Sequence, residues 1–361
     1  MARTKNLNKL TQKEIGEYRG KVLEWYDRHG RELPWRYKNG EKPNPYHVWL
    51  SEIMCQQTTV QAVKPYYTKF LSTWPTVQDL ANADDDDVMG AWAGLGYYAR
   101  ARNLHKCAKV IANDYNGKFP DSQAELIKLP GIGDYTSAAI ATIAFNEPAT
   151  VMDGNIERVM ARFFLIEDPL PKAKKIFKTH TTRFFEGYRE RPGDFAQSLM
   201  DIGSSICTPK NPKCMLCPLN EGCIAKQKGG AETLPVKIKA KNRPSKIGEV
   251  YWITNEKGEI LVEKRPDKGL LANMLALPTS SWEVSEKPIN RPKITKNINL
   301  KSRNIHINHV FTHFDLKLVL KTGKTDLKTI KKENYSWIEP QKIKNKLPTV
   351  FKKAFVKFMV E

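Results

Sequence analysis

Four cysteines in the second half of the chain are the residues whose type and spacing most clearly indicate chemistry. They form the pattern C-x6-C-x2-C-x5-C and are Cys207, Cys214, Cys217 and Cys223. Four thiolates so close in sequence favour one shared metal centre, either zinc or an iron–sulfur cluster. Structural zinc sites usually combine two short Cys-x2-4-Cys pairs, and here only the central pair is close. The wide outer gaps favour a bulkier cluster, but spacing alone leaves both metals open.

A pair of disulfides is the alternative use of these cysteines. Disulfides are typical of small secreted modules, but the sequence shows no signal peptide and only two further cysteines, Cys55 and Cys107. We therefore expect a metal site in an intracellular protein of the cytoplasm or nucleoid.

Composition indicates a partner with many negative charges. The 361 residues are enough for two domains, and no apolar run approaches the ~18 residues of a membrane span, so we expect no membrane partner. The formal net charge is +20, and residues 286–361 contain 18 Lys and Arg against 6 Asp and Glu. Nucleic acid is the expected partner, and charge by itself fits DNA and RNA equally well.

The periodicity of apolar residues changes along the chain. Residues from about Thr11 to Ala225 have the pattern of helices joined by short turns, for example at 44–70, 121–129, 135–145 and 156–165. Residues 226–245 show no periodicity and are interpreted as a linker. Beyond them the period becomes two, with a hairpin around Asn255–Gly258, an alternating strand from Phe314 and a closing helix. We predict a mainly α domain at 1–225 and an α+β domain at 246–361.

The segment Leu129-Pro-Gly-Ile-Gly-Asp-Tyr-Thr could bind an anion. Gly131 and Gly133 permit a tight hairpin with exposed backbone N–H groups, and an Ala-rich helix follows. This pattern, at about 129–140, is typical of a helix-hairpin-helix that binds DNA phosphates. The alternative is an ordinary Pro-Gly connector, and the basic composition together with the four cysteines favours DNA.

Two carboxylates stand out in this helical region. Glu52 lies in the apolar and aromatic segment WLSEIMCQQT, and Asp153 precedes a helix in VMDGNI. Taken singly, Glu52 could be a solvated helix residue and Asp153 an N-cap. Together, in a DNA-binding domain, they fit the cleavage of a glycosidic bond. A protonated acid would activate the leaving group, and an ionised carboxylate would stabilise an oxocarbenium-like sugar.

These motifs, in this order, resemble the endonuclease III superfamily of DNA glycosylases. WLSEIMCQQT, GLGYYARARNLH, LPGIGDYT, VMDGNIERV and FAQSLMDIG are similar to its adenine-specific, MutY-type branch, and the similarity is dense from Leu33 to Cys223. The resemblance implies that Glu52 is the catalytic acid and Asp153 the catalytic carboxylate, with Asn155 placing water. Tyr135 occupies the position of the Schiff-base lysine of lyase-competent relatives, which implies a monofunctional enzyme. Residues implied to contact DNA or the lesion are Arg36, Gln57, Thr58, Leu95, Tyr97, Gly131 and Gly133.

The resemblance extends to the cofactor and to the second domain. It implies that the cysteines of the 207–223 loop hold a [4Fe–4S] cluster. RPDKGLLANMLALP and Phe311-Thr312-His313 are similar to a Nudix-like lesion-recognition domain, although ordinary strand packing would also explain Phe311 and His313. The expected fold is therefore a helix-hairpin-helix glycosylase domain followed by an α+β Nudix-like domain. The glutamate-rich Nudix box is absent, so we expect no pyrophosphohydrolase activity.

The implied function is removal of adenine mispaired with 8-oxoguanine, and with guanine, from double-stranded DNA in base excision repair. The N-glycosidic bond of a flipped adenine would be cleaved with the help of Glu52 and Asp153. The alternatives are a glycosylase acting on thymine in T·G mismatches or on oxidised pyrimidines, and a non-catalytic lesion-binding protein. We expect a monomer whose linker could contact other repair proteins.

Overall fold

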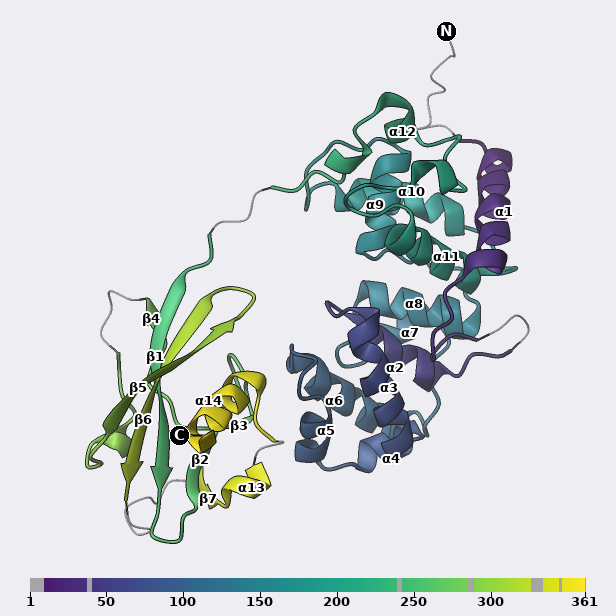
Figure 1. Ribbon diagram of the computed structural model, residues 1–361. Coiled ribbons are helices and arrows are strands. Elements are labelled where there is room, and N and C mark those ends of the chain that lie inside the picture. The colour runs from purple at the N-terminus through teal and green to yellow at the C-terminus, as the bar shows by residue number, and fades with distance from the viewer. Residues whose placement is uncertain are drawn as a thin grey trace. The chain divides into compact units, whose positions relative to one another are not determined.

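The computed structural model describes residues 10–37, 41–238, 242–284, 289–325, 334–343 and 346–360 (Figure 1). They form two compact units, Met1–Ala81 with Lys106–Lys239 and Asn82–His105 with Ala240–Glu361. The predicted linker 226–245 includes residues 239–241, which lie outside the described residues. Each unit is described by itself.

The described residues between Thr11 and Ala225 form helices joined by short turns, as the sequence predicts, and α12 runs on into the predicted linker. The helices are α1 Gln12–His29, α2 Pro45–Cys55, α3 Val60–Thr73, α4 Val77–Asn82, α5 Asp85–Ala91, α6 Ala99–Asp114, α7 Gln123–Leu126, α8 Asp134–Phe145, α9 Gly154–Phe163, α10 Lys174–Phe185, α11 Pro192–Ser205 and α12 Ile224–Lys228, with 3-10 turns at Cys214–Leu216 and Ala231–Thr233. No helix among these described residues is long and apolar enough to cross a membrane.

Side-chain caps explain where several of these helices begin. Thr11 and Glu14 form a reciprocal capping box at α1, and Asn44 accepts a hydrogen bond from the Tyr46 backbone at the start of α2. Asp84 caps α5, with three further aspartates in its first turn where the helix dipole favours negative charge. The acidic run is thus explained by its position at the N-terminus of α5.

The predicted helix at 44–70 is wrong in one respect, because it is two helices. α2 ends at Cys55 and α3 begins at Val60, with Gln57 between them in the left-handed region at φ 53°. Thr59 then caps α3 by accepting a hydrogen bond from the Ala62 backbone. The helix predicted at 121–129 is also too long, because α7 spans only Gln123–Leu126.

The helices of the first unit pack around an aromatic core. α2 contacts α8, and α11 contacts α8, α9 and α1; Figure 1 shows α2 beside α8 and α9 near α10. Fully buried side chains of α2, α9, α10 and α11 include Trp49, Phe163, Phe177, Phe185 and Phe195. Their burial fixes the ends of α2, α8 and α9, which carry the predicted catalytic residues.

The second unit contains a mixed sheet. Its strands are β1 Ser245–Thr254, β2 Ile260–Lys264, β3 Leu275–Ala276, β4 Glu283–Val284, β5 Lys301–Val310, β6 Asp315–Lys324 and β7 Tyr335–Ile338, with a 3-10 turn at Lys293–Thr295. The main order is β3-β2-β1-β6-β5, while β4 pairs with β1 and β7 with β2. β1 and β6 are parallel in the register Ser245↔Asp315 to Thr254↔Lys324, and the other pairs are antiparallel.

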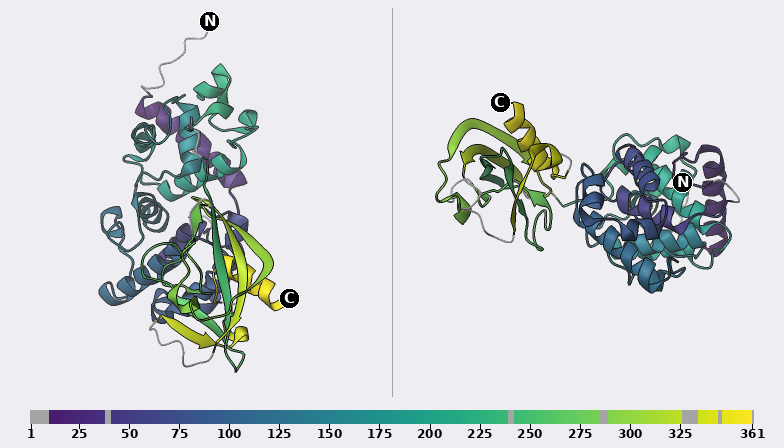
Figure 2. Two further views of the ribbon diagram at one scale, coloured as in Figure 1. Left: turned by 90° about the vertical axis from the view of Figure 1, so that its left-hand side faces the viewer. Right: turned by 90° about the horizontal axis from the view of Figure 1, so that it is seen from below.

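The predicted hairpin and alternating strand are confirmed. β1 and β2 form the hairpin around Asn255–Gly258, and Leu316, Leu318 and Leu320 of β6 are buried. Two helices close the chain, α13 Pro340–Ile343 and α14 Thr349–Val360. Figure 2 shows the C-terminal helix lying against the sheet, where Phe355 and Phe358 contact Trp252 of β1. The second unit is therefore built around a layer of sheet covered by helix.

Candidate active site

A large cavity in the first unit collects most of the predicted site residues. Its volume is about 1250 Å³. The lining residues that the sequence predicted are Glu52, Tyr135, Asp153, Asn155, Arg36, Gln57, Thr58, Gly131 and Gly133. They come from segments far apart in the sequence, so the helical packing creates the site. Gln197 of α11 also lines the cavity and was not predicted.

Glu52 is the acidic group with the clearest chemical perturbation. It lies near the end of α2 and accepts a hydrogen bond of 2.5 Å from the Tyr135 hydroxyl at its Oε2. Burial raises the pKa of Glu52 to about 7, helped by the nearby Asp153 and opposed by the Tyr135 hydrogen bond and by Arg36. A carboxyl with this pKa is protonated in a large fraction of molecules near neutral pH and can act as a general acid.

Asp153 is both a helix cap and a site carboxylate. Its Oδ1 accepts hydrogen bonds from the backbone N–H groups of Asn155 at 2.9 Å and Ile156 at 2.7 Å, and its Oδ2 accepts one from Asn155 Nδ2 at 2.8 Å. Burial raises the pKa of Asp153, while these hydrogen bonds and Arg158 favour the ionised form. Both oxygens of the carboxylate are therefore held in a fixed orientation.

Two arginines of α9 connect this carboxylate to the cysteine segment. Arg158 donates to Asn155 Oδ1 at 2.9 Å and to the Cys207 carbonyl at 2.7 Å, and it also bonds the Gly203 carbonyl. It thus fixes the amide that holds Asp153. Arg158 was not predicted from the sequence, although Arg158 and Arg162 are four residues apart just after Asp153 and so place two cations on one helix face.

The connection between α2 and α3 brings backbone strain to the cavity wall. Gln57 has φ 53°, a conformation that is uncommon outside glycine, and such strain often accompanies function. Gln56 donates to Thr136 Oγ1 at 3.0 Å, which ties the turn to the start of α8. This turn presents Gln57 and Thr58 to the cavity.

The predicted hairpin precedes α8. Gly131 has φ 76°, and Gly133 is the N-cap residue of α8 without a side-chain cap. Both glycines are exposed, as is Asp134. The helix N-terminus is therefore accessible to an anion, which is the feature that the sequence predicted.

Arg36 has a structural partner inside the site. Its guanidinium donates to both oxygens of the fully buried Asp201, at 2.6 and 2.7 Å, and Arg31 donates to the same carboxylate at 2.6 Å. Breaking such a buried pair would leave an uncompensated charge. Arg36 still lines the cavity and lowers the pKa of Glu52, so it acts on the site through its charge.

The four cysteines line a single small hollow. Cys207, Cys214, Cys217 and Cys223 face it together with Arg162. None of the His, Cys, Asp and Glu side chains that the structure describes converge in threes closely enough to hold one metal ion. Four thiols around one hollow are the donor set that zinc sites and iron–sulfur clusters share.

Arg162 supports this hollow from α9. It is 1% exposed and donates to Cys207 Sγ at 3.3 Å and to the carbonyls of Thr208 at 2.8 Å, Pro209 at 3.1 Å and Leu234 at 3.1 Å. A buried guanidinium with these partners holds the chain on both sides of the cysteine loop. Burial raises the pKa of the Cys207 thiol, and the positive charge and hydrogen bond of Arg162 oppose that shift.

The remaining predicted residues lie in the second unit. Tyr97 is 44% exposed with φ 48°, whereas Leu95 is buried. The hydroxyls of Tyr97 and Thr312 share a hydrogen bond of 2.9 Å. Thr312 and His313 are exposed between β5 and β6, and Phe311 is half-buried. The structure thus joins two segments that were predicted separately to contact the lesion.

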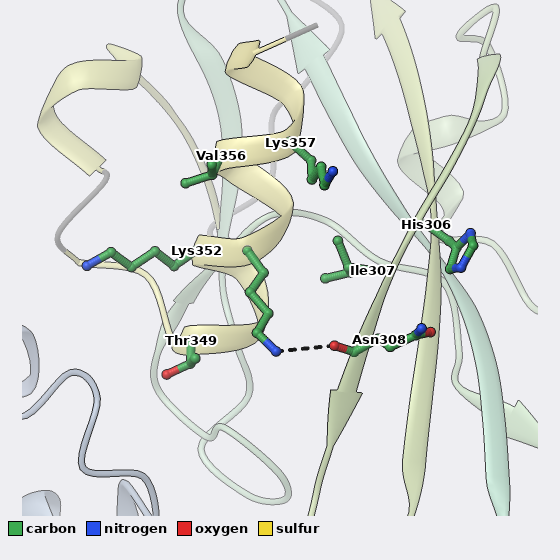
Figure 3. A pocket seen from close by; sticks show the side chains of 8 residues that line it. His306, Ile307, Asn308, Thr349, Lys352, Val356 and Lys357 are labelled. Carbon is green, nitrogen blue, oxygen red and sulfur yellow. Dashed lines mark hydrogen bonds between the residues drawn. The ribbon is translucent and has the colours of Figure 1, made fainter. Parts of the chain in front are cut away.

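A second hollow, of about 490 Å³, lies between β5 and α14 (Figure 3). Lys352, Lys353 and Lys357 of α14 and His306 of β5 line it, and Lys353 donates to the Asn308 carbonyl at 3.3 Å. None of the described residues that line this hollow is acidic. It is a basic surface without the carboxylates that the larger cavity contains.

Comparisons with protein families match three parts of the chain. Residues 50–186 match the HhH-GPD superfamily base excision DNA repair protein, residues 207–223 the iron–sulfur binding domain of endonuclease III, and residues 249–357 the NUDIX domain. The predicted fold classes of both domains are confirmed. The iron–sulfur match also decides the metal left open by cysteine spacing, and its limits coincide with the first and last cysteine.

Similar proteins extend over most of the chain. An adenine DNA glycosylase of Buchnera aphidicola from Schizaphis graminum is 36% identical over 82% of this chain and 85% of its own length. The human adenine DNA glycosylase is 34% identical over 76% of this chain and 59% of its own length. Among solved structures, a thermostable thymine-DNA glycosylase is 27% identical and covers 60% of this chain and 98% of its own, with a TM-score of 0.53.

Proposed function

Because the chain belongs to the adenine DNA glycosylases, hydrolases of N-glycosyl bonds in base excision repair, we propose that it removes adenine mispaired with 8-oxoguanine or guanine. The observation that carries the mechanism is the Glu52 carboxyl. This carboxyl accepts a hydrogen bond of 2.5 Å from the Tyr135 hydroxyl, in the cavity that Asp153 also lines. Burial raises the pKa of Glu52 to about 7. The substrate is double-stranded DNA.

Glu52 acts as the general acid. In its protonated form it gives a proton to N7 of adenine, so that the base leaves as a neutral molecule when its bond to the sugar breaks. The cavity around it has room for an extruded base, since its volume is about 1250 Å³. Tyr135 holds one oxygen of Glu52 and so orients the proton toward the base.

Asp153 stabilises the positive charge that develops on the sugar. Three hydrogen bonds fix its carboxylate, and Asn155 supplies two of them, one from the backbone and one from the side chain. A carboxylate that is oriented before the reaction stabilises an oxocarbenium-like sugar without reorganising. Asn155 also places the water that adds to the anomeric carbon.

The reaction ends at the abasic site. Tyr135 stands where a lyase would need an amine to form a Schiff base, and a phenol cannot form one. Its pKa is raised well above the ordinary value by burial and by the neighbouring Glu52, so it stays protonated. We therefore propose a monofunctional enzyme.

Binding of the mispair uses both units. The Gly131–Gly133 hairpin holds DNA phosphates, Gln57 and Thr58 hydrogen-bond in the lesion pocket, and Tyr97 with Leu95 fills the stack vacated by adenine. Strain at Gln57 and Tyr97 supports these assignments, since both residues have φ near +50°. Arg36 tunes the charge of the pocket.

The second unit provides specificity for the oxidised guanine. Thr312 and His313 project from the turn between β5 and β6, and Phe311 flanks them. The hydrogen bond between Tyr97 and Thr312 supports a common role for these residues. We propose that the domain binds the lesion and hydrolyses no pyrophosphate. We also propose that the enzyme acts as a monomer and that its linker contacts other repair proteins.

The cysteines of the 207–223 loop hold the iron–sulfur cluster, whose charge and bulk shape the loop. Arg162 orients Cys207 by a hydrogen bond to its sulfur. We propose that Lys210 and Lys213 of this loop contact the DNA backbone, and that the cluster takes no part in bond cleavage.

The test uses excess enzyme and a duplex with one adenine opposite 8-oxoguanine. We expect strand breakage only after hot alkali, which reveals base removal without lyase cleavage, and no adenine release by E52Q. Breakage without alkali would contradict the monofunctional assignment. Release of thymine from a T·G duplex in place of adenine would favour the thymine-specific relatives. Tight binding without release of any base would indicate a lesion-binding protein.

A further inference from the structure

The turn that carries Thr312 and His313 has little support of its own. The Phe311 N–H donates to the Phe314 carbonyl at 2.9 Å and closes the hairpin, and both tip residues are exposed. The flanking rings of Phe311 and Phe314 are half-buried and lie 4.9 Å apart between centroids. Apart from the hydrogen bond between Tyr97 and Thr312, the orientation of the tip depends on what these two rings pack against, including the His309 ring that lies 4.5 Å from that of Phe311.

Trp282 provides that support. Its indole stacks on Phe311 at 5.7 Å with an interplanar angle of 27°, and it contacts Phe314 at 6.2 Å and the buried Phe351 of α14 at 6.5 Å. The indole N–H is buried and has no hydrogen-bond partner among the described residues. Packing alone therefore holds this ring, in contrast to most buried tryptophans.

Two residues form the seat for the indole, Arg265 just after β2 and Gly248 of β1. The Arg265 guanidinium lies over its ring at 5.3 Å and donates to the Leu270 carbonyl at 3.2 Å. A Cβ on Gly248 of β1 would lie 2.7 Å from Trp282 Cδ1, so only glycine leaves room for the ring. Arg265 and Leu270 belong to the RPDKGLL segment, which the proposed function leaves without a role.

We propose that Trp282 is a positioning residue for recognition of the base opposite adenine, and that it couples the RPDKGLL segment to the Thr312–His313 tip. This inference rests on the proposed role of that tip in binding 8-oxoguanine. Arg265 and Gly248 place the indole, the indole places Phe311, and Phe311 sets the direction of the tip. None of the three supporting residues needs to contact DNA.

The experiment measures discrimination in binding, which is independent of cleavage. The full-length protein is titrated with duplexes that carry 2′-fluoro-2′-deoxyadenosine, whose fluorine disfavours a cationic sugar, opposite 8-oxoguanine or guanine. Discrimination is the dissociation constant for the guanine duplex divided by the dissociation constant for the 8-oxoguanine duplex. For W282A we expect a fall of about fivefold, the size of one lost aromatic stack. G248A should lower the ratio in the same way, and W282F should restore most of it.

Matched controls separate positioning from loss of the fold. Trp252 lies in the same unit and packs on Phe355 and Phe358, with no ring contact to the tip. W252A should keep the discrimination of the wild type even where its Tm falls as far as that of W282A. If W252A and W282A lose discrimination equally, the inference is overturned.

A double variant of the tip distinguishes the two proposals. T312A/H313A should lose discrimination if the tip reads the base. If it does and W282A does not, the positioning role is wrong and the proposed function stands. If the wild type shows no discrimination, or T312A/H313A retains it, the proposed role of the tip fails and the inference fails with it.

Discussion

The Glu52 carboxyl gives the enzyme a pH dependence whose sign follows from its environment. Burial raises its pKa to about 7, so the acid form that the proposed mechanism requires is present below that pH and lost above it. Asp153 must be ionised, and its pKa is also raised, so activity falls again in acid. We expect a bell-shaped profile of the single-turnover rate with the alkaline limb near pH 7. A rate that rises steadily through pH 7 would exclude Glu52 as the acid.

Tyr135 allows this assignment to be checked in a variant. Its hydroxyl donates to Glu52 and favours the ionised carboxylate, so Y135F should raise the pKa of Glu52 further. A hydrogen bond to a charged group is worth ~1.5–3 kcal/mol, and one pKa unit is about 1.4 kcal/mol. The alkaline limb of the pH–rate profile should therefore move up by about one to two units. An unchanged limb in Y135F would mean that another group titrates there.

At the scale of elements, α9 joins the carboxylate to the cluster loop. Arg162 is almost fully buried and donates to Cys207 Sγ. It also donates to the carbonyls of Thr208, Pro209 and Leu234. R162M keeps the aliphatic bulk and leaves these acceptors unpaired, so we expect it to lower the free energy of unfolding by about 3 kcal/mol or more. Iron content and visible absorbance of the cluster should fall with it.

An exposed ion pair between α10 and the start of α8 offers a control for R162M. Lys178 bonds Asp134 at 2.7 Å with both side chains largely exposed. Removing its charge as K178M should change stability little, because exposed pairs contribute at most ~1 kcal/mol. Equal iron loss in both variants would argue against a specific role of Arg162.

The elements also show what the sequence could and could not predict. The spacing of Trp49, Ile53 and Val63 correctly identified the buried face. It continued through the turn at Gln57, because the spacing of apolar residues does not reveal a residue with positive φ. The proposed site residues in that turn therefore appeared helical. Arg162 could not be recognised, because its partners are carbonyls more than 40 residues away. Local motifs correctly placed Glu52 within a helix and Asp153 at the N-cap of the next one, α2 and α9 in the structure.

For the whole molecule, the net charge of +20 predicts how binding responds to salt. Contacts between Lys or Arg and phosphates release counterions, so the logarithm of the affinity falls linearly with the logarithm of salt concentration, by about 0.9 per phosphate contact. These contacts carry no sequence information, whereas the proposed role of the Thr312–His313 tip is to distinguish the base opposite adenine.

We therefore expect duplexes with 8-oxoguanine, with guanine and with a normal pair opposite the site to give parallel salt lines separated by a constant offset. Binding isotherms at several salt concentrations, with the non-cleavable adenosine analogue in the mispairs, measure both quantities. T312A/H313A should reduce the offset and keep the slope, because it removes no Lys or Arg side chain that contacts a phosphate. A slope that changed with the base opposite adenine would mean that lesion recognition itself recruits phosphate contacts, and the two units would then share the electrostatic part of binding.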